Sequence, residues 1–296
     1  MRDKRTRLCC ILVALAHLSG GATASAEPVT EERTRPNIIF IMSDDHTAQA
    51  IGAYGSHLAE LDPTPTIDRL ANQGMRFDRV FCHNSICTPS RANILTGQYS
   101  KTNGVEVLGL PLPPERQYLP IELSEAGYQT AVIGKWHLRA EPAAFDFYCV
   151  LPGQGDFFDP VFRVQGPKPW PENTIQNVGV HSSDAITELT LDWLENKRDP
   201  SRPFFLAHQY KAPHDMFENA PRYDGFLEEM TIPEPPNLRE PIGASIATQG
   251  KGAGMSKYSR WRLGERLGID NRQDDESYFN ETYQTFMRRY LRCVKG

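Results

Sequence analysis

A continuous apolar run at residues 37–42 ends abruptly in the polar cluster Ser43-Asp44-Asp45-His46. Two later apolar runs, at residues 128–133 and 204–207, also lead into polar segments. Continuous apolar runs of this length are typical of strands that are buried on both faces of a sheet. We therefore expect at least three buried strands whose ends bring polar side chains to one edge of the sheet.

Helical patterns separate these runs. Helices are predicted at Pro65–Gln73, between Thr64 as N-cap and Gly74, at Pro120–Ala126 and at Ser183–Asn196. Residues 142–179 are rich in Gly, Pro and aromatic side chains, and we interpret them as a long surface excursion. Strands that alternate with helices predict an α/β fold, with a largely parallel mixed sheet flanked by helices.

The first 26 residues have the three-part pattern of a secretory signal peptide. Basic residues precede the apolar stretch Leu8–Leu18, and Ala24-Ser25-Ala26 forms an A-x-A cleavage site. The apolar stretch is shorter than the roughly 20 residues that span a membrane. We therefore expect export to the periplasm or the exterior without a stable membrane anchor. Residues 27–35 form a polar leading segment, and residues 36–296 form the main domain.

Composition narrows the function classes. With 40% hydrophobic and 23% charged residues, the chain is neither a disordered tail nor a coiled coil. Its formal charge of −5, without a long basic run, argues against a nucleic-acid partner. Disulfide pairing and oligomeric state cannot be predicted from this sequence.

Three polar clusters follow the predicted strands, where open α/β sheets bind their ligands. They contain Asp44 and Asp45, then Lys135 and His137, and finally His214. Adjacent carboxylates repel one another unless a cation neutralises them, and a hard divalent ion such as Ca²⁺ or Mg²⁺ suits oxygen ligands. A solvated turn is the alternative for an isolated Asp-Asp pair.

The segment Cys87-Thr88-Pro89-Ser90-Arg91 gives the most specific signal. Together with residues 36–45, Gly134-Lys135-Trp136-His137 and Lys211-Ala212-Pro213-His214, it resembles the sulfatases of the alkaline phosphatase superfamily. The four stretches occur in the order that this family shows. The resemblance extends from about residue 36 to the end of the chain and implies the α/β fold of that superfamily.

The resemblance implies a mechanism and a role for each residue. Cys87 is converted to formylglycine (3-oxoalanine) by a separate formylglycine-generating enzyme, and the aldehyde hydrate attacks the sulfur of a sulfate ester. Asp44, Asp45 and residue 87 are implied as ligands of Ca²⁺ or Mg²⁺. The implied catalytic residues are Cys87, Arg91, Lys135, His137 and His214, with Lys135, His214 and Lys211 binding the substrate.

Other segments resemble sulfatases that act on glycans, of the N-acetylglucosamine-6-sulfatase type. They are Gly104–Val107, Lys211–Glu218 and the helical pattern at Tyr283–Leu291. The expected partner is therefore a sulfated carbohydrate, although the sugar and the position of its sulfate cannot be read from the sequence. A hydrolase of phosphate or phosphonate monoesters from the same superfamily is the first alternative.

The resemblance also calls for a later strand that ends in Asp-Asn or Asp-Gln and completes the cation site. No such strand is found, and Asp270-Asn271 is interpreted as a polar turn. The amphipathic pattern from Tyr283 to Val294 runs almost to Gly296 without a clear end. We therefore interpret the chain as the N-terminal part of a sulfatase and expect weak metal binding and little turnover. An inactive fragment that at most binds sulfated glycans is the second alternative.

Overall fold

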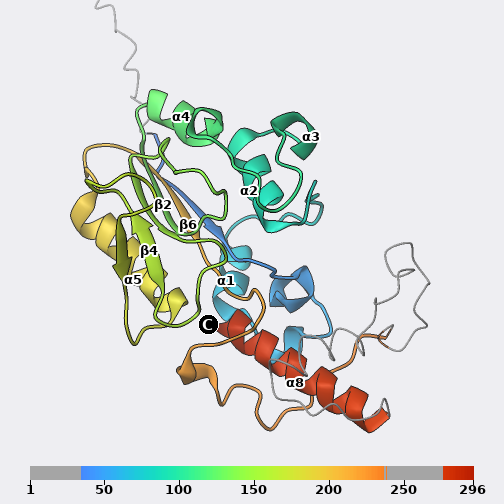
Figure 1. Ribbon diagram of the computed structural model, residues 1–296. Helices are drawn as coiled ribbons and strands as arrows, with labels where there is room; N and C mark the ends of the chain where they lie inside the picture. The colour runs from blue at the N-terminus through green and yellow to red at the C-terminus, as the bar shows by residue number, and fades with distance from the viewer. Residues whose placement is uncertain (1–34, 237, 239–275) are drawn as a thin grey trace, which may run out of the picture. The chain divides into compact units, whose positions relative to one another are not determined.

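The computed structural model describes residues 35–236, 238 and 276–296. The chain divides into the units Met1–Arg35 and Pro36–Gly296, and every described element belongs to the second. That unit contains a six-stranded sheet with the strand order β1-β6-β2-β3-β4-β5 (Figure 1). The expected polar turn at Asp270-Asn271 lies outside the described residues.

The sheet is largely parallel. Neighbours among β1, β6, β2 and β3 pair in parallel, whereas β4 pairs antiparallel with both β3 and β5. The mixed α/β architecture expected from the sequence is therefore confirmed. The strands are β1 (Ile38–Met42), β2 (Gln129–Lys135), β3 (Phe147–Leu151), β4 (Val161–Val164), β5 (Thr174–Gln176) and β6 (Phe204–Gln209).

Helices form where the sequence pattern predicts them. The predicted helices correspond to α1 (Pro65–Gln73), α4 (Tyr118–Glu125), α5 (Ser182–Asp192) and α8 (Glu276–Lys295). A π-helical turn at Trp193–Lys197 continues α5. Further helices are α2 (Cys87–Thr96) and α3 (Ser100–Asn103), with short 3-10 helices at Ala48–Ala50, Gly52–Tyr54, Ala59–Leu61, Pro114–Arg116 and Pro221–Tyr223.

The alternation of side chains along β2 separates two hydrophobic cores. Val132 points to one face of the sheet and joins a core that includes Leu95 of α2. Ala131 and Ile133 point to the other face and join a core that includes Ile186 of α5. The middle of the sheet is therefore covered by helices on both faces, as a parallel sheet requires.

Residues 142–179 contain three strands of the sheet, so the expected surface excursion is wrong. The β3 residues Cys149 and Val150 are fully buried, and Phe162 of β4 is as well. The Gly and Pro residues of this segment occupy the turns between short strands. The continuous apolar run of β3 was the signal for a buried strand, and composition obscured it.

The first strand is not buried on both faces, contrary to the expectation. Within the described chain β1 pairs only with β6 and lies at an edge of the sheet. Ile39 is 51% exposed and Ile41 is 60% exposed, while Ile38, Phe40 and Met42 are half-buried. The continuous apolar run therefore predicts the strand correctly, but it does not predict whether one or both faces of that strand are buried.

A third hydrophobic core lies around α8. Tyr283, Tyr290 and Leu291 of this helix pack with Phe217 and with residues of the segment that follows β1, such as Leu58. In Figure 1 the helix runs below the sheet, on the side where β1 leads into its loop. The helix thus supports the edge of the sheet at which the predicted polar clusters meet.

Two further observations concern the cysteines and the hydrophobicity of the helices. The cysteines at positions 82, 87, 149 and 293 are all free thiols in the described chain. No helix among the described residues combines the length and the hydrophobicity needed to cross a bilayer.

Candidate active site

Residues from four parts of the chain meet at the carboxyl ends of β1, β6 and β2. Asp44 follows β1, Cys87 is the first residue of α2, Lys135 ends β2, and His214 lies in the loop after β6. Ligand atoms of Asp44, Cys87 and His214 all lie within 4.8 Å of one another. The structure thus gathers residues that are up to 170 positions apart, because parallel strands end at the same edge of a sheet.

Asp44 is held between two buried cations. Its Oδ2 forms an ion pair with Lys135 Nζ, and Arg91 Nη2 lies 3.5 Å away. Burial alone would raise the pKa of Asp44, but Arg91 and Lys135 outweigh it and hold the pKa below its usual value. Asp44 is therefore an ionised carboxylate inside the protein.

Arg91 links three elements of the site. It is 3% exposed, and its Nη1 donates a hydrogen bond to the Lys135 carbonyl oxygen at 2.6 Å. The same nitrogen donates to Oε1 of Gln209, the last residue of β6. Gln209 was not identified from the sequence, although it ends a buried strand just as Lys135 does.

Lys135 faces the cysteine of the motif. Its Nζ lies 4.0 Å from Cys87 Sγ and donates a hydrogen bond to Gln154 Oε1 at 2.6 Å. The residue is fully buried. Gln154 also escaped the sequence analysis. It lies between Gly153 and Gly155, both of which have positive φ, and such a turn was the only available signal.

The thiol of Cys87 is not activated in its unmodified form. Burial raises its pKa, and the negative charge of Asp44 raises it further, while Lys135 acts in the opposite direction. A thiol nucleophile requires a lowered pKa. The surroundings of Cys87 therefore suit something other than thiolate chemistry.

His137 contacts the first turn of α2. It has the left-handed φ of 55°, and its carbonyl oxygen accepts a hydrogen bond from Thr88 Oγ1 at 2.9 Å. Burial, assisted by the nearby Lys135 and Arg91, lowers the pKa of His137 to about 4. Its imidazole is consequently neutral near pH 7.

His214 connects the remaining predicted residues. Its Nδ1 lies 2.8 Å from Asp215 Oδ1, and its Nε2 lies 3.6 Å from Asp45 Oδ2. Lys211, three positions earlier, is 4% exposed, and its Nζ stands 4.3 Å from the centre of the Phe157 ring. Burial and the charge of Lys135 lower the pKa of Lys211.

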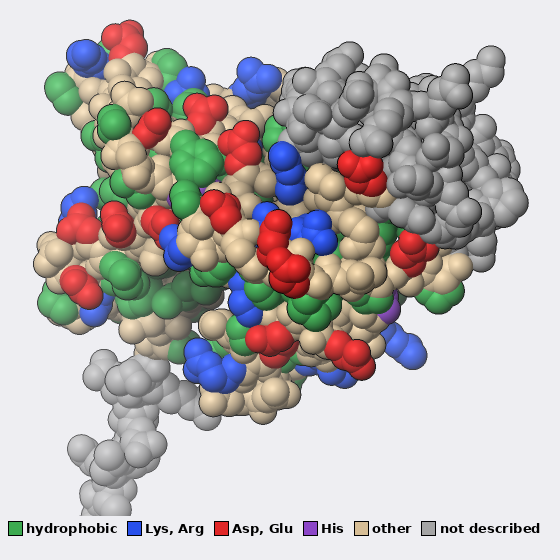
Figure 2. Space-filling view, turned by 90° about the horizontal axis from the view of Figure 1, so that it is seen from below, with side chains coloured by type: hydrophobic (Ala, Val, Ile, Leu, Met, Phe, Trp, Pro, Cys, Tyr) green, Lys and Arg blue, Asp and Glu red, His purple; other side chains and the backbone are tan. Residues whose placement is uncertain are grey.

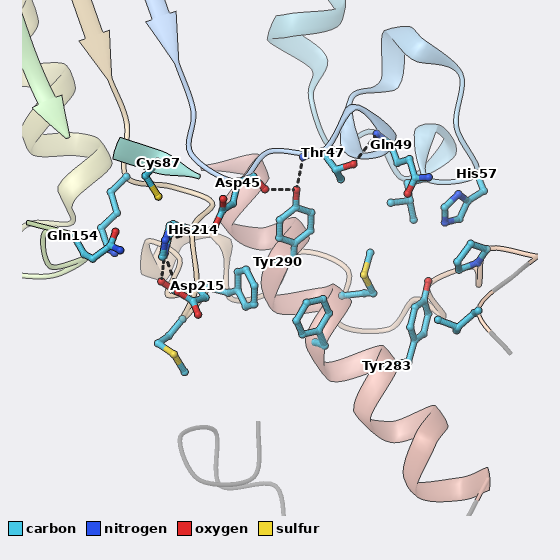
Figure 3. A pocket seen from close by; sticks show the side chains of 18 of the residues that line it. Asp45, Thr47, Gln49, His57, Cys87, Gln154, His214, Asp215, Tyr283 and Tyr290 are labelled. Carbon is cyan, nitrogen blue, oxygen red and sulfur yellow. Dashed lines mark hydrogen bonds and ion pairs between the residues drawn. The ribbon is translucent and has the colours of Figure 1, made fainter. Parts of the chain in front are cut away.

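A cavity of about 880 Å³ opens beside Cys87 (Figure 3). Asp45, Cys87 and His214 line one part of it, and side chains of α8 line another. A second cavity, of about 470 Å³, is lined by residues from both the loop after β1 and the start of α2. Among the described residues, the linings of the two cavities have Asp45, Thr47 and Cys87 in common, so both cavities reach the segments that carry these residues.

The acidic residues present oxygen donors that suit a hard divalent cation. Asp44 and Asp45 are adjacent, and residue 87 stands beside Asp44. Because Ca²⁺ takes ~6–8 oxygen ligands, these residues fit one side of such a site and do not fill it. His214, the nitrogen donor of the same cluster, is a poorer match for this class of ion.

The buried cations differ from the charges on the surface. On the face shown in Figure 2, acidic and basic side chains are intermixed and not separated by sign. In the site, by contrast, Arg91, Lys135 and Lys211 are all buried near the single buried carboxylate of Asp44. The interior of the site is therefore suited to an anionic group.

The comparisons with known proteins agree on one family. A family model described as sulfatase matches residues 36–294. The N-acetylglucosamine-6-O-sulfatase of Bacteroides thetaiotaomicron is 43% identical over 77% of this chain and 39% of its own length. The ulvan-active sulfatase of Formosa agariphila is 27% identical over 95% of this chain and 55% of its own length.

A solved structure has the same fold. The structure of BT4656 in complex with its substrate D-glucosamine-2-N,6-O-disulfate is 33% identical, with a TM-score of 0.73. The match covers 88% of this chain and 59% of that one. The chain thus spans between about two fifths and three fifths of the length of these three relatives.

Proposed function

The chain belongs to the sulfatase family, and on that basis we propose that it acts in the hydrolysis of sulfate esters of glycans. The observation that carries this proposal is the position of Cys87 against Lys135, with Sγ and Nζ 4.0 Å apart. A buried ammonium group beside the motif cysteine can bind a sulfate oxygen and stabilise charge in the transition state.

The proposal includes conversion of Cys87 to formylglycine, as in the family. The aldehyde hydrate would supply the nucleophilic oxygen that the protonated thiol does not offer. Arg91, four residues later on α2, is held by Gln209 and by the Lys135 carbonyl oxygen, so its charge stays beside residue 87. Conversion requires a formylglycine-generating enzyme as a partner, and export through residues 1–26 remains part of the same proposal.

A divalent cation, Ca²⁺ or Mg²⁺, is proposed as the resident metal. Asp44, Asp45 and an oxygen of residue 87 would hold it, and when bound it supplies positive charge that favours the ionised form of an oxygen ligand. Asp44 is already ionised in this structure. Ligands beyond these residues are needed to complete the coordination.

His214 is proposed as the general acid that protonates the leaving alcohol. Its Nδ1 is oriented by Asp215, while Nε2 faces Asp45 at the wall of the cavity. An imidazole held in this way can donate a proton to the oxygen of a leaving alcohol. Lys211, which lines the same cavity, is proposed to contact the sulfated substrate.

A glycan is the proposed substrate class. It is supported by the relatives named above, one of which is an N-acetylglucosamine-6-O-sulfatase and another of which binds a sulfated glucosamine. The cavity of about 880 Å³ lies within the range of small-molecule sites, so a sulfated monosaccharide can enter beside Cys87.

The test is to produce the chain together with a formylglycine-generating enzyme. Mass spectrometry and labelling with an aldehyde-reactive probe should detect formylglycine at position 87, and Cys87→Ala serves as the unlabelled control. Sulfate release from glucosamine 6-sulfate is then compared with phosphate release from glucosamine 6-phosphate, with added Ca²⁺. The proposal expects a higher kcat/KM for the sulfate ester.

Three outcomes separate the alternatives. A higher kcat/KM for the phosphate ester would identify a phosphoryl hydrolase and contradict the proposal. Calorimetric binding of the sulfated sugar without product would identify a binding protein. An unmodified Cys87 after co-expression would contradict the proposed nucleophile.

A further inference from the structure

The hydroxyl of Tyr290 holds the loop that carries both acidic residues. It accepts a hydrogen bond from the Thr47 amide at 2.9 Å and donates one to the carbonyl oxygen of Asp45 at 3.1 Å (Figure 3). Tyr290 belongs to α8 and lies 243 residues after Thr47. One phenol thus bridges two backbone groups on either side of His46.

Tyr290 is itself fixed in place. Its side chain is 6% exposed, and its ring packs edge-on against Phe217, with centroids 5.5 Å apart. A tyrosine hydroxyl can donate one hydrogen bond and accept others, and the hydroxyl of Tyr290 does both here. The hydroxyl therefore stays at one position relative to the core around α8.

The helix has further anchors. Gln284 exchanges two hydrogen bonds with the backbone of Ile232, at 2.7 and 2.9 Å. Arg288 Nε donates to the Leu227 carbonyl oxygen at 2.8 Å. These contacts, with the hydrophobic core, make α8 a firm support for the loop that Tyr290 reaches.

Asp45 needs such a support. Its φ of 63° is left-handed, a conformation that costs a non-glycine residue roughly 1–3 kcal/mol and persists only when the surroundings impose it. Its side chain is 52% exposed, and its described ion-pair contact is with His214 at 3.6 Å. The direction of the carboxylate therefore depends mainly on the backbone of the loop.

The neighbouring Asp44 is held differently. Its amide donates to the Ala212 carbonyl oxygen at 3.1 Å, and its carboxylate is paired with buried cations. The two acidic residues thus have separate supports, one from the loop after β6 and one from α8.

We propose that Tyr290 is a positioning residue for Asp45: its hydroxyl fixes the left-handed backbone that aims this carboxylate at the cation site. The inference rests on the proposed function, which makes Asp45 a cation ligand. Contacts of this kind, made behind a ligand, typically change metal affinity by roughly 10- to 100-fold when they are removed.

Tyr290→Phe is the direct test, because it removes the hydroxyl and keeps the ring. Tyr283→Phe is the matched control. Tyr283 is on the same helix and is 2% exposed, and its hydroxyl donates to the Pro233 carbonyl oxygen at 2.7 Å. Melting temperatures without calcium verify that both variants fold.

Calcium affinity is measured by calorimetry up to millimolar concentrations. Tyr290→Phe should weaken it by roughly 10-fold or more, and Tyr283→Phe should leave it unchanged. In a chain that already carries Asp45→Asn, Tyr290→Phe should have little further effect, since both changes act through one ligand. Equal affinities of the two Phe variants would overturn the proposal.

Hydrogen exchange gives a readout that does not require metal. The Thr47 amide should be protected in the unsubstituted chain and lose protection in Tyr290→Phe but not in Tyr283→Phe. An unprotected Thr47 amide in the unsubstituted chain would overturn the proposal without any variant. Absence of calcium binding in that chain would instead contradict the proposed cation site, and loss of protection in Tyr290→Phe would still identify Tyr290 as the support of the loop.

Discussion

Gly134 of β2 lies so close to Gln209 of β6 that a Cβ atom at position 134 would overlap the Gln209 carbonyl oxygen. The two residues are register partners in parallel strands. Gly134 also has a φ of 106°, which side-chain-bearing residues rarely adopt. Gly134 directly precedes Lys135, and Gln209 accepts a hydrogen bond from Arg91. The close approach of the two strands therefore helps to set the distance between Lys135 and Arg91.

Gly134→Ala should therefore destabilise the protein strongly. Overpacking against backbone, added to the strained φ, is expected to lower the free energy of unfolding by about 3 kcal/mol or more. Urea unfolding measures the change. Gly55→Ala is the matched control, because its φ of 69° is also positive but no atom lies within 4 Å of the added Cβ. That change should cost only about 1–2 kcal/mol. Similar losses at both positions would contradict the predicted overlap.

Lys135→Met should show how much the buried ion pair between Lys135 and Asp44 contributes to the free energy of unfolding. Removal of the ammonium leaves a buried carboxylate with Arg91 at 3.5 Å as its remaining ion-pair partner. Breaking a buried ion pair in this way costs about 3–5 kcal/mol. Lys197→Met is the comparison, since Lys197 pairs with Asp192 on the surface, where solvent screens the two charges, and its loss should leave stability nearly unchanged. If Lys135→Met and Lys197→Met shift the urea midpoint equally, the ion pair between Lys135 and Asp44 is as well solvated as a surface pair.

Stability should depend on pH through His208. Burial lowers the pKa of His208 to about 4, whereas a histidine in an unfolded chain titrates near 6.5. Between about pH 6.5 and pH 4 the unfolded state therefore binds more protons, and the free energy of unfolding falls as pH falls, by up to about 1.4 kcal/mol per unit.

His208→Asn tests that dependence. An amide can still meet the Thr190 hydroxyl, which lies 2.7 Å from Nδ1 of the imidazole, but it does not titrate. The slope of stability against pH should become shallower in the variant. It should not vanish, because His137 also has a pKa of about 4 and acts in the same direction. An unchanged slope would rule out His208 as a contributor.

His214→Ala should affect substrates according to their leaving groups. Loss of a general acid lowers kcat by roughly 100- to 10,000-fold when the leaving group is an alcohol. An aryl sulfate releases a phenolate that needs no proton, so its kcat should fall much less. A steady-state comparison of a sugar sulfate with an aryl sulfate measures the difference. Equal losses would assign His214 a role in binding or in structure.

Sequence patterns predicted the strands and helices whose structure is determined by the residues of the element itself. Apolar runs predicted β1, β2 and β6, and amphipathic spacing predicted α1, α5 and α8. Among the missed strands, β3 is as long as β1 but lies in a segment rich in Gly and Pro, whereas β5 has only three residues, all of them exposed. Such a strand is specified by its partner β4 and not by its own pattern.

The candidate site shows the same division. Asp44 follows β1, Lys135 ends β2 and His214 lies in the loop after β6, and all three were proposed from their positions at the ends of apolar runs and from the family motifs. Gln154 and Tyr290 were not, because each acts through contacts that only the folded chain creates. Glutamine in a glycine turn and tyrosine on an apolar helix face are common without any such role, so nothing local distinguishes them.

Among the described residues, the outer edge of β1 has no partner strand. Its outer backbone groups, together with Ile39 and Ile41, form a template on which another extended segment could assemble. The same strand is the stem from which Asp44 and Asp45 project. A segment that paired along that edge would satisfy its free backbone groups and would also restrain the strand that leads into both carboxylates.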